Sequence, residues 1–185
     1  LSKVEKFPIN LILASGLAIS KDNSDKIYDR FRNRLIVPIN DMQGRVVAFG
    51  GRSLDGQEPK YLNSPESEIF EKGKMLFAFE KASSNIRKRD KAILVEGYFD
   101  VIALHSRGIT NSVAALGTAL NKYQISQLCR CTDNKNIILN FDSDNAGILA
   151  TNRVIKEVES LSLHDQINLK ILQLSDFKDP DEYLN

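Results

Sequence analysis

Strand-like and helix-like segments alternate through the second half of the chain. Short runs of consecutive apolar residues, the pattern of a strand buried on both faces, are each followed by a segment with helical periodicity. The predicted strands are 92–96, 112–116, 136–141 and 167–174. The predicted helices are 100–107, which ends at Gly108, 122–128 and 146–161. Because strands that alternate with helices form right-handed βαβ units, we predict a four-stranded parallel sheet.

The first half of the chain has a different pattern. An apolar patch over 7–13 predicts one helix, and apolar runs over 34–39 and 45–49 predict two strands joined as a β-hairpin. Gly50-Gly51-Arg52 is expected to break the second of these strands, at a bulge or a close backbone approach. Helical periodicity resumes over 79–89. These elements predict a smaller α/β subdomain built around the hairpin.

The net charge of +1 conceals a difference between the two halves. Residues 1–90 contain 16 Lys and Arg against 12 Asp and Glu, whereas residues 91–185 contain 9 against 12. We therefore predict a basic subdomain over 1–90 and an acidic one over 91–185. The composition, 42% hydrophobic and 26% charged, is that of a globular protein and excludes a fibre or a disordered tail. No apolar run approaches the roughly 20 residues that a membrane helix needs.

Cysteine usage and the chain ends complete the general picture. Cys129 and Cys131 are the only cysteines, and at this spacing their side chains point in different directions, so neither a disulfide nor a zinc site is expected. They are interpreted as small apolar residues in a reduced, intracellular protein. The chain starts at Leu1 and has no signal-peptide pattern, so we expect a fragment of a longer polypeptide.

Acidic residues lie at the ends of the predicted parallel strands. Glu96 ends the first strand, and Asp142 follows the third directly, with Asp144 two residues later. Parallel α/β sheets bind ligands at the carboxyl ends of their strands. Carboxylates gathered there repel one another unless their pKa values rise or cations bind, and Mg²⁺ and Mn²⁺ prefer oxygen ligands. The other members of this predicted cation site are Asp100, Asp179 and Asp181.

Several of these acids also have a simpler structural explanation. Asp144 could cap the helix that begins at residue 146, and Asp179-Pro180-Asp181 could form a turn and a helix cap. Glu96 could be a solvated strand end. Because all of these coincidences would have to occur together at three strand ends, a shared site is the better interpretation.

Basic residues are spread through the first subdomain. Arg and Lys side chains hold phosphate backbones, and exposed aromatic rings can stack on bases. A solvated charged face is the better interpretation of any single residue, and Arg87-Lys88-Arg89 suits a helix end, where cations are favoured. Together the remaining residues form a candidate nucleic-acid surface. They are Arg30, Arg32, Arg34, Arg52, Lys60 beside Tyr61, and Lys72.

Several motifs resemble a known family. Residues 95–101 (VEGYFDV) and 141–147 (FDSDNAG) resemble the two signatures of the Toprim domain, a metal-binding module of bacterial primases, topoisomerases and some nucleases. The basic half narrows this resemblance to the catalytic core of bacterial DnaG-type DNA primases. Its motifs, in family order, are 28–34 (YDRFRNR), 50–52 (GGR) and 59–65 (PKYLNSP), followed by 116–120 (LGTAL) and 178–182 (KDPDE). Ser143 departs from the glycine usual between the two aspartates, for which we expect only a modest backbone effect.

The resemblance implies an N-terminal α/β subdomain beside a Toprim subdomain, with a groove between them. It implies template-directed synthesis of short RNA primers on single-stranded DNA, with ribonucleoside triphosphates as substrates and Mg²⁺ or Mn²⁺ as the cofactor. The cytoplasm, at the replisome, is the implied location, or an organelle if the source is eukaryotic. The implied catalytic acids are Glu96, Asp142, Asp144 and, in support, Asp100; the metal ligands are Glu96, Asp142, Asp144, Asp179 and Asp181. The residues implied to bind nucleic acid or nucleotide are Arg32, Arg34, Arg52, Lys60, Asn63 and Lys72.

Other domains and other functions remain to be weighed. The family carries an upstream zinc-binding domain and a downstream domain that binds the replicative helicase; with two cysteines and an end at residue 185, we expect neither domain here, and no zinc. The alternatives are another Toprim enzyme (a nuclease or a topoisomerase subunit), a haloacid-dehalogenase-like phosphatase with Asp142 as nucleophile, or a nucleic-acid-binding module without turnover. The ordered basic motifs argue against the first. The phosphatase nucleophile follows the first strand, whereas Asp142 follows the third predicted strand of the sheet.

Overall fold

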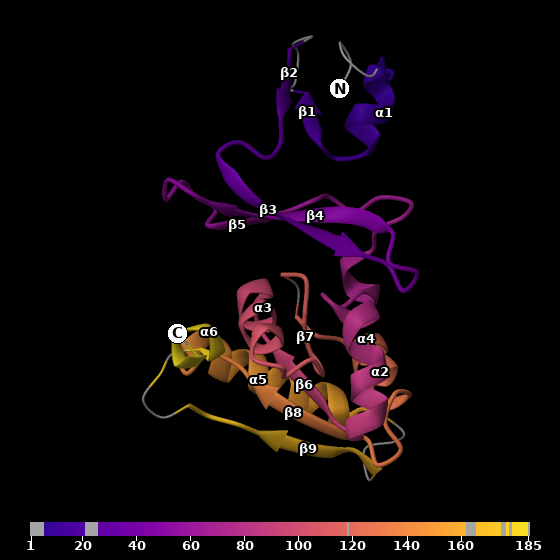
Figure 1. The fold of residues 1–185 in the computed structure, drawn as a ribbon, viewed down its shortest axis with the longest axis vertical. Helices are drawn as coiled ribbons and strands as arrows, with labels where there is room; N and C mark the ends of the chain where they lie inside the picture. The colour runs from indigo at the N-terminus through magenta and orange to yellow at the C-terminus, as the bar shows by residue number, and fades with distance from the viewer. Residues whose placement is uncertain are drawn as a thin grey trace. The chain divides into compact units, whose positions relative to one another are not determined.

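The computed structural model describes residues 6–20, 26–117, 119–161, 166–174, 177 and 179–184 (Figure 1). Thr118 and Lys178, which belong to two of the motifs above, lie outside the described residues. The chain forms two compact units, Leu1–Glu71 and Lys72–Asn185. Helix α2 (Phe79–Arg89), which lies within the predicted basic subdomain, packs its apolar side chains into the core of the second unit.

The first unit consists of one helix and two small antiparallel sheets. Its elements are α1 (Ile9–Ala14), β1 (Ala18–Ser20), β2 (Ile27–Asp29), β3 (Arg34–Asn40), β4 (Val46–Ser53) and β5 (Tyr61–Asn63). Strands β1 and β2 pair with each other, and the other three form a sheet in the order β3-β4-β5. The predicted helix and β-hairpin are confirmed; the three short strands β1, β2 and β5 were not predicted.

The predicted break in β4 is wrong, although the close approach predicted with it is present. Strand β4 continues through Gly50 and Gly51 to Ser53, and these residues pair with both β3 and β5. The irregularity in the hairpin lies elsewhere, between Ile39 and Asn40. A Cβ atom on Gly51 would lie 2.8 Å from Cδ1 of Phe31, so the glycine is needed for packing rather than for ending the strand.

The second unit contains the predicted parallel sheet. Its elements are a 3₁₀ turn η1 (Lys72–Lys74), α2, β6 (Ala92–Val95), α3 (Tyr98–Ser106), β7 (Ser112–Ala114), α4 (Lys122–Cys129), β8 (Asn136–Asn140), α5 (Asn145–Glu159), β9 (Asn168–Ile171) and α6 (Pro180–Leu184). All neighbouring strands are parallel, in the order β7-β6-β8-β9. The predicted strands and helices agree with these bounds to within three residues, whereas η1 and α6 were not predicted.

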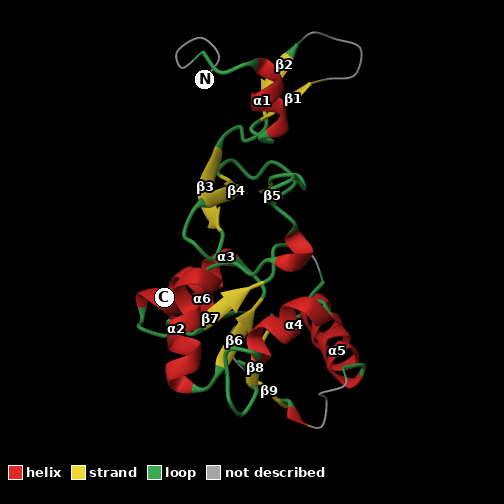
Figure 2. Cartoon of the chain, turned by 90° about the vertical axis from the view of Figure 1, so that its right-hand side faces the viewer, coloured by secondary structure: helices red, strands yellow, loops and turns green. Residues whose placement is uncertain are grey.

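Helices cover both faces of this sheet. Figure 2 shows α2, α3 and α6 on one face and α4 and α5 on the other. The core between them contains Leu94 and Leu139 of the central strands and Ile125 of α4, all at most 1% exposed. Cys129 and Cys131 are free thiols buried in the same core, as expected for small apolar residues, and burial raises the pKa of the Cys129 thiol. No helix among the described residues is long and apolar enough to cross a membrane.

Candidate active site

Glu96 and Asp142 lie at the carboxyl ends of the two central strands. Val95 at the end of β6 pairs with Asn140 at the end of β8, so the residues that follow both strands reach the same edge. There the backbone N–H of Asp142 donates a hydrogen bond to Oε1 of Glu96 over 3.2 Å. The strand order reverses direction between β6 and β8, and such switch points are where open α/β sheets bind ligands.

The first turn of α5 packs directly against this pair. Oδ1 of Asp144 accepts hydrogen bonds from the backbone N–H groups of Ala146 and Gly147, at 2.9 and 3.0 Å, so Asp144 caps the helix as its structural explanation predicted. A Cβ atom on Gly147 would overlap the carbonyl oxygen of Asp142 and lie 2.8 Å from Oε1 of Glu96. Gly147 therefore allows the helix to start against the acidic pair. The sequence signal was a glycine inside a helix, where it is intrinsically unfavourable.

Asp100 lies at the start of α3 and is only 7% exposed. Its Oδ2 accepts a hydrogen bond from the backbone N–H of Gly97 at 3.0 Å, and the backbone N–H of Asp181 also donates to its carboxylate. Burial raises the pKa of Asp100 to about 7, and the negative charges of Asp179 and Asp142 act in the same direction. Three of the predicted acids thus lie close enough to affect one another electrostatically.

Helix α6 brings the last predicted acids beside α3. Oδ1 of Asp179 accepts a hydrogen bond from the backbone N–H of Glu182 at 2.8 Å, which caps this short helix and confirms the structural explanation for Asp179. Helix α6 packs against α3, and Nη2 of Arg107, the residue directly after α3, donates a hydrogen bond to the carbonyl of Leu184. This packing, which the sequence did not predict, holds Asp179 and Asp181 near Asp100.

The donor set suits a hard divalent cation, but it does not form a closed cage. In the part of the chain that the structure describes, no three Asp, Glu, His or Cys side chains converge closely enough to hold a metal ion. Mg²⁺ usually keeps several waters and is held by one or two carboxylates together with substrate phosphates. The carboxylates at this edge therefore fit an ion that is shared with a phosphate-bearing ligand.

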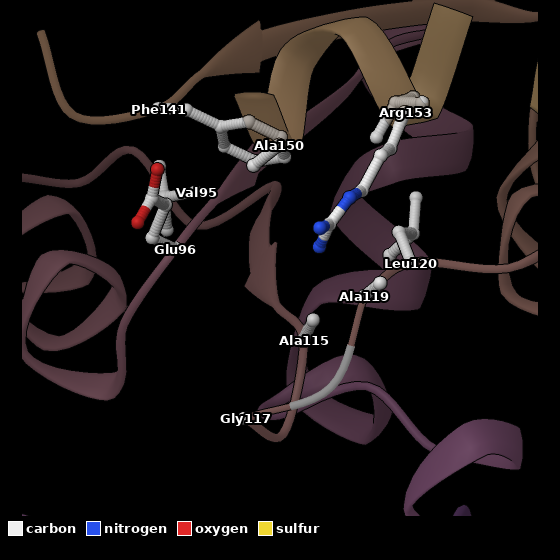
Figure 3. Close-up of a pocket in the computed structure, with 10 residues that line it drawn as sticks. Val95, Glu96, Ala115, Gly117, Ala119, Leu120, Phe141, Ala150 and Arg153 are labelled. Carbon is white, nitrogen blue, oxygen red and sulfur yellow. The ribbon is translucent and has the colours of Figure 1, made fainter. Parts of the chain in front are cut away.

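A cavity of about 210 Å³ opens beside Glu96 (Figure 3). Its walls are mostly apolar side chains from the ends of the central strands, from the segment after β7 and from α5. Arg153 of α5 extends its guanidinium into this space. Sequence reasoning missed Arg153, although its spacing from Ala150 and Val154 places an arginine on an otherwise apolar helix face, which was the available signal.

The candidate basic residues of the first unit do not all share one surface. Arg52 pairs with Tyr61 and Gly50 pairs with Asn63 across the β4–β5 register, so the side chains of Arg52, Tyr61 and Asn63 lie on one face of that sheet. Arg34 pairs with Ser53, one residue further along β4, and therefore lies on the opposite face. Arg32 is exposed in the segment between β2 and β3.

Arg34 is occupied by backbone contacts. Its Nη1 donates a hydrogen bond to the carbonyl of Pro59 at 2.8 Å and approaches the carbonyls of Gly51 and Lys60 at 3.5 Å each. It thereby fastens the segment that carries Lys60, whose exposed Nζ lies 5.5 Å from the ring centre of Tyr61. These contacts through Nη1 join Arg34 to the segment that precedes β5.

Two more basic residues differ from the expected surface. Arg30 donates through Nε and Nη2 to the carbonyl of Asn63, at 3.2 and 3.0 Å, which fixes β5 beside the segment after β2. Lys72 lies in η1, at the start of the second unit. The predicted basic residues therefore differ in their surroundings. Arg30 and Arg34 donate to backbone carbonyls, whereas Lys72 lies on the second unit, which also carries the carboxylates.

Comparisons with known proteins identify the family of the chain. Residues 1–83 match the family model for the N-terminal domain of the DNA primase catalytic core, and residues 93–184 match the Toprim-like model. A DNA primase from Synechococcus elongatus is 54% identical over 180 residues, which are 97% of this chain and 26% of that protein. The chain belongs to the DnaG-type DNA primases. The Toprim match falls on the unit that carries the parallel sheet and the carboxylates.

Solved structures of primases have the same fold. A DNA primase domain from Pseudomonas aeruginosa is 42% identical with a TM-score of 0.86, over 94% of this chain and 53% of that one. A DnaG primase catalytic domain bound to single-stranded DNA is 37% identical with a TM-score of 0.82, over 98% of this chain and 56% of that one. The chain thus spans about a quarter of the length of its curated relatives and about half of the solved chains. These matches favour a primase over the topoisomerase, nuclease and phosphatase alternatives.

Proposed function

We propose that this chain is the part of a primase catalytic core that joins ribonucleotides into short RNA primers on a single-stranded DNA template. The observation that carries the proposal is the gathering of Glu96, Asp142, Asp100 and Asp179 at the carboxyl edge of a Toprim sheet. Such a set of carboxylates suits nucleotidyl transfer, in which a divalent ion balances the charge of the triphosphate.

The acids divide into two groups by their surroundings. Glu96 and Asp142 form the centre of the site and are the first candidates to hold Mg²⁺ or Mn²⁺, with Asp144 at the start of α5 and with Asp179 and Asp181 near Asp100. When bound, such an ion would lower the pKa of the primer 3′-hydroxyl and neutralise the triphosphate. Asp100 is proposed as a supporting residue. It is buried, and its carboxylate accepts hydrogen bonds from the backbone N–H groups of Gly97 and Asp181.

The template is proposed to contact the first unit. Lys60 and Tyr61 offer an exposed cation beside an aromatic ring, and Arg52 and Asn63 lie on the same sheet face as Tyr61. This combination suits a single strand, because a lysine can bind phosphate while a ring stacks on a base. A related DnaG primase catalytic domain bound to single-stranded DNA supports a single-stranded template for this chain. Arg34 would act by holding the Lys60 segment.

The family also suggests the roles of the two subdomains, the substrates, the location and a protein partner. We propose a division of labour between a basic subdomain that binds template and an acidic Toprim subdomain that binds metal and nucleotide. Ribonucleoside triphosphates are the proposed substrates, and the cytoplasm, at the replisome, is the proposed location. In the full-length protein we expect a helicase contact through a region beyond the stretch matched here.

Removal of the central aspartate tests the proposed function. In the full-length protein, Asp142→Ala should reduce ribonucleotide incorporation on a single-stranded template by at least about 100-fold, because it removes a central carboxylate while leaving the buried core intact. Asp133→Ala is the matched control, since Asp133 is an exposed aspartate just before β8, at the opposite edge of the same sheet. Equal incorporation by the two variants would refute the site.

A further inference from the structure

Helix α3 presents an acid to one end of helix α6 and an arginine to the other. Asp100 lies in the first turn of α3, and Arg107 directly follows its last residue. The two residues are seven positions apart, about two helical turns, so they lie on the same face of α3. Asp100 accepts a hydrogen bond from the backbone N–H of Asp181, and Nη2 of Arg107 donates one to the carbonyl of Leu184. Both ends of α6 are therefore attached to one face of α3.

The two attachments match the polarity of α6. Backbone N–H groups without a partner in the helix gather at its start, and such carbonyls gather at its end. An acid at the start and an arginine at the end interact favourably with these groups. Helix α6 has only five residues, and its first, Pro180, is the buried one. Because so short a helix is not stable by itself, α6 depends on its packing against α3.

The acids at the start of α6 move with it as one piece. Oδ1 of Asp179 accepts a hydrogen bond from the backbone N–H of Glu182 at 2.8 Å, and its carbonyl accepts one from that of Tyr183 at 3.1 Å. The ring of Tyr183 also contacts the ring of Phe177, with their centroids 5.1 Å apart, which closes the turn that carries Asp179. Any shift of α6 therefore shifts both Asp179 and Asp181 relative to α3.

We propose that Arg107 is a positioning residue for the cation site: by holding the end of α6, it keeps the two acids of α6 where they share a divalent cation with Glu96 and Asp142. The inference rests on the proposed function, and it adds a residue that contacts neither the cation nor the nucleotide. In the described residues, no three acids converge closely enough to hold a metal ion by themselves. The affinity for a cation therefore depends on how firmly α6 is held.

The positive charge of Arg107 by itself would have the opposite effect on a cation. Along α3, Arg107 lies roughly 10 Å from Asp100, at a rise of about 1.5 Å per residue, which is close to the distance at which salt screens exposed charges. A positive charge at that distance repels Mn²⁺ weakly, so its removal alone would strengthen Mn²⁺ binding slightly. Loss of the attachment of α6 would weaken the binding. The direction of the change therefore identifies its cause.

Arg107→Met and Arg107→Lys test the attachment. Methionine keeps an apolar stem but has no donor, whereas lysine keeps a cationic donor. In the full-length protein, Arg107→Met should weaken Mn²⁺ binding, measured by electron paramagnetic resonance, about fivefold, the effect of one lost charge-assisted hydrogen bond. The Mn²⁺ concentration for half-maximal primer synthesis should rise by a similar factor, with a smaller change in kcat at saturating Mn²⁺. Arg107→Lys should recover most of the loss.

Arg89→Met is the matched control. Arg89 is also an exposed arginine of the second unit, and it donates to the carbonyl of Gly108 at 3.0 Å and to Oδ1 of Asn111 at 3.2 Å. These contacts join α2 to the turn after α3 and not to α6. Arg89→Met should therefore lower the stability to urea and leave Mn²⁺ binding unchanged. Because Arg107 is exposed as well, Arg107→Met should fold, which the same urea measurement checks.

Replacement of the acids of α6 tests whether Arg107 acts through them. Asp179→Asn together with Asp181→Asn removes both charges, while an asparagine at 179 can still cap the helix. In this background Arg107→Met should cause no further loss of Mn²⁺ binding. A further fivefold loss would show that Arg107 does not act through these acids, and would overturn the inference.

The remaining outcomes separate the inference from the proposed function. Unchanged or tighter Mn²⁺ binding in Arg107→Met, or an equal loss in Arg89→Met, would overturn the positioning role while primer synthesis by the wild type stands. Absence of primer synthesis by the wild type, with Mn²⁺ binding weakened in the expected pattern, would refute the proposed function alone.

Discussion

The parallel sheet carries an aspartate near each of its two edges, and the two aspartates differ in their surroundings. Asp90, just before β6, accepts four hydrogen bonds: from the backbone N–H groups of Asp133 and Asn134, at 2.7 and 3.1 Å, and from the side-chain amides of Asn134 and Asn136, at 2.6 and 3.2 Å. These hydrogen bonds, led by that of the Asn134 side chain, hold the pKa of Asp90 below its ordinary value. Its charge is satisfied by the protein alone.

Asp100, at the carboxyl edge, is in the opposite situation. Burial raises its pKa to about 7, and the charges of Asp179 and Asp142 raise it as well. The backbone N–H groups of Gly97 and Asp181 donate to the carboxylate and lower the pKa, but by less than burial and the two charges raise it. An acid surrounded by amides is structural, whereas acids surrounded by other acids need protons or cations. The position of acidic residues at strand ends is therefore not enough to identify a site; their burial and hydrogen-bond partners distinguish the two edges.

The largest effect is expected from disturbing the close packing of α5 against Glu96 and Asp142 at the carboxyl edge. Gly147→Ala should abolish primer synthesis, because the added methyl group overlaps the carbonyl of Asp142 and displaces Glu96. Overpacking of this kind typically costs about 1–3 kcal/mol of stability, so the unfolding free energy should also fall. Incorporation assays and urea unfolding measure the two effects.

Ala146→Ser serves as the control for Gly147→Ala, since Ala146 is exposed in the same turn of α5. It should keep nearly full activity and stability. Wild-type activity in Gly147→Ala would show that the contact between α5 and the acidic pair is not required.

The fold was largely predictable because its larger elements have long, regular patterns. Helix α2 has the predicted bounds, and β6 and β8 differ from the predicted strands by one residue, since buried apolar runs leave few alternatives. Strands β1, β2 and β5 have three residues each, too few for a period to be recognised. Their formation depends on partners that are distant in sequence.

The site was predictable in composition but not in detail. The motifs indicated Glu96 and Asp142, because acids after buried parallel strands reach one edge. They did not indicate that Arg34 would be occupied by the carbonyl of Pro59, or that Lys72 would belong to the second unit. Both facts depend on contacts between segments 25 to 52 residues apart, which no local pattern encodes.

Asp100→Asn should reveal the crowding at the carboxyl edge through pH. The folded pKa of Asp100, about 7, is above the 3.8 of an unperturbed aspartate, so between these values the folded state holds a proton that the unfolded state has lost. The contribution of Asp100 to stability is complete below about pH 4 and falls as pH rises to 7, by up to about 1.4 kcal/mol per pH unit.

The measurement is urea unfolding of wild type and Asp100→Asn at pH 5 and pH 8, with a chelator present. Since asparagine does not titrate, the variant should gain stability relative to the wild type as the pH rises. A constant difference between the two proteins would show that Asp100 is not electrostatically strained.

The same substitution at the other edge should have a smaller effect of opposite sign. Asp90→Asn keeps an acceptor and tolerates the left-handed backbone at this position (φ 47°), but it loses the charge that four hydrogen bonds stabilise. Because the folded pKa of Asp90 is lowered, its contribution to stability is present above about pH 4 and is lost as the pH falls further. At pH 8 the variant should therefore melt roughly 1–3 °C below the wild type, with unchanged primer synthesis. Stabilisation by Asp90→Asn, or a loss of activity, would contradict the electrostatic difference between the two edges. In that case the number of hydrogen-bond donors around an aspartate would not distinguish a structural acid from a cation ligand.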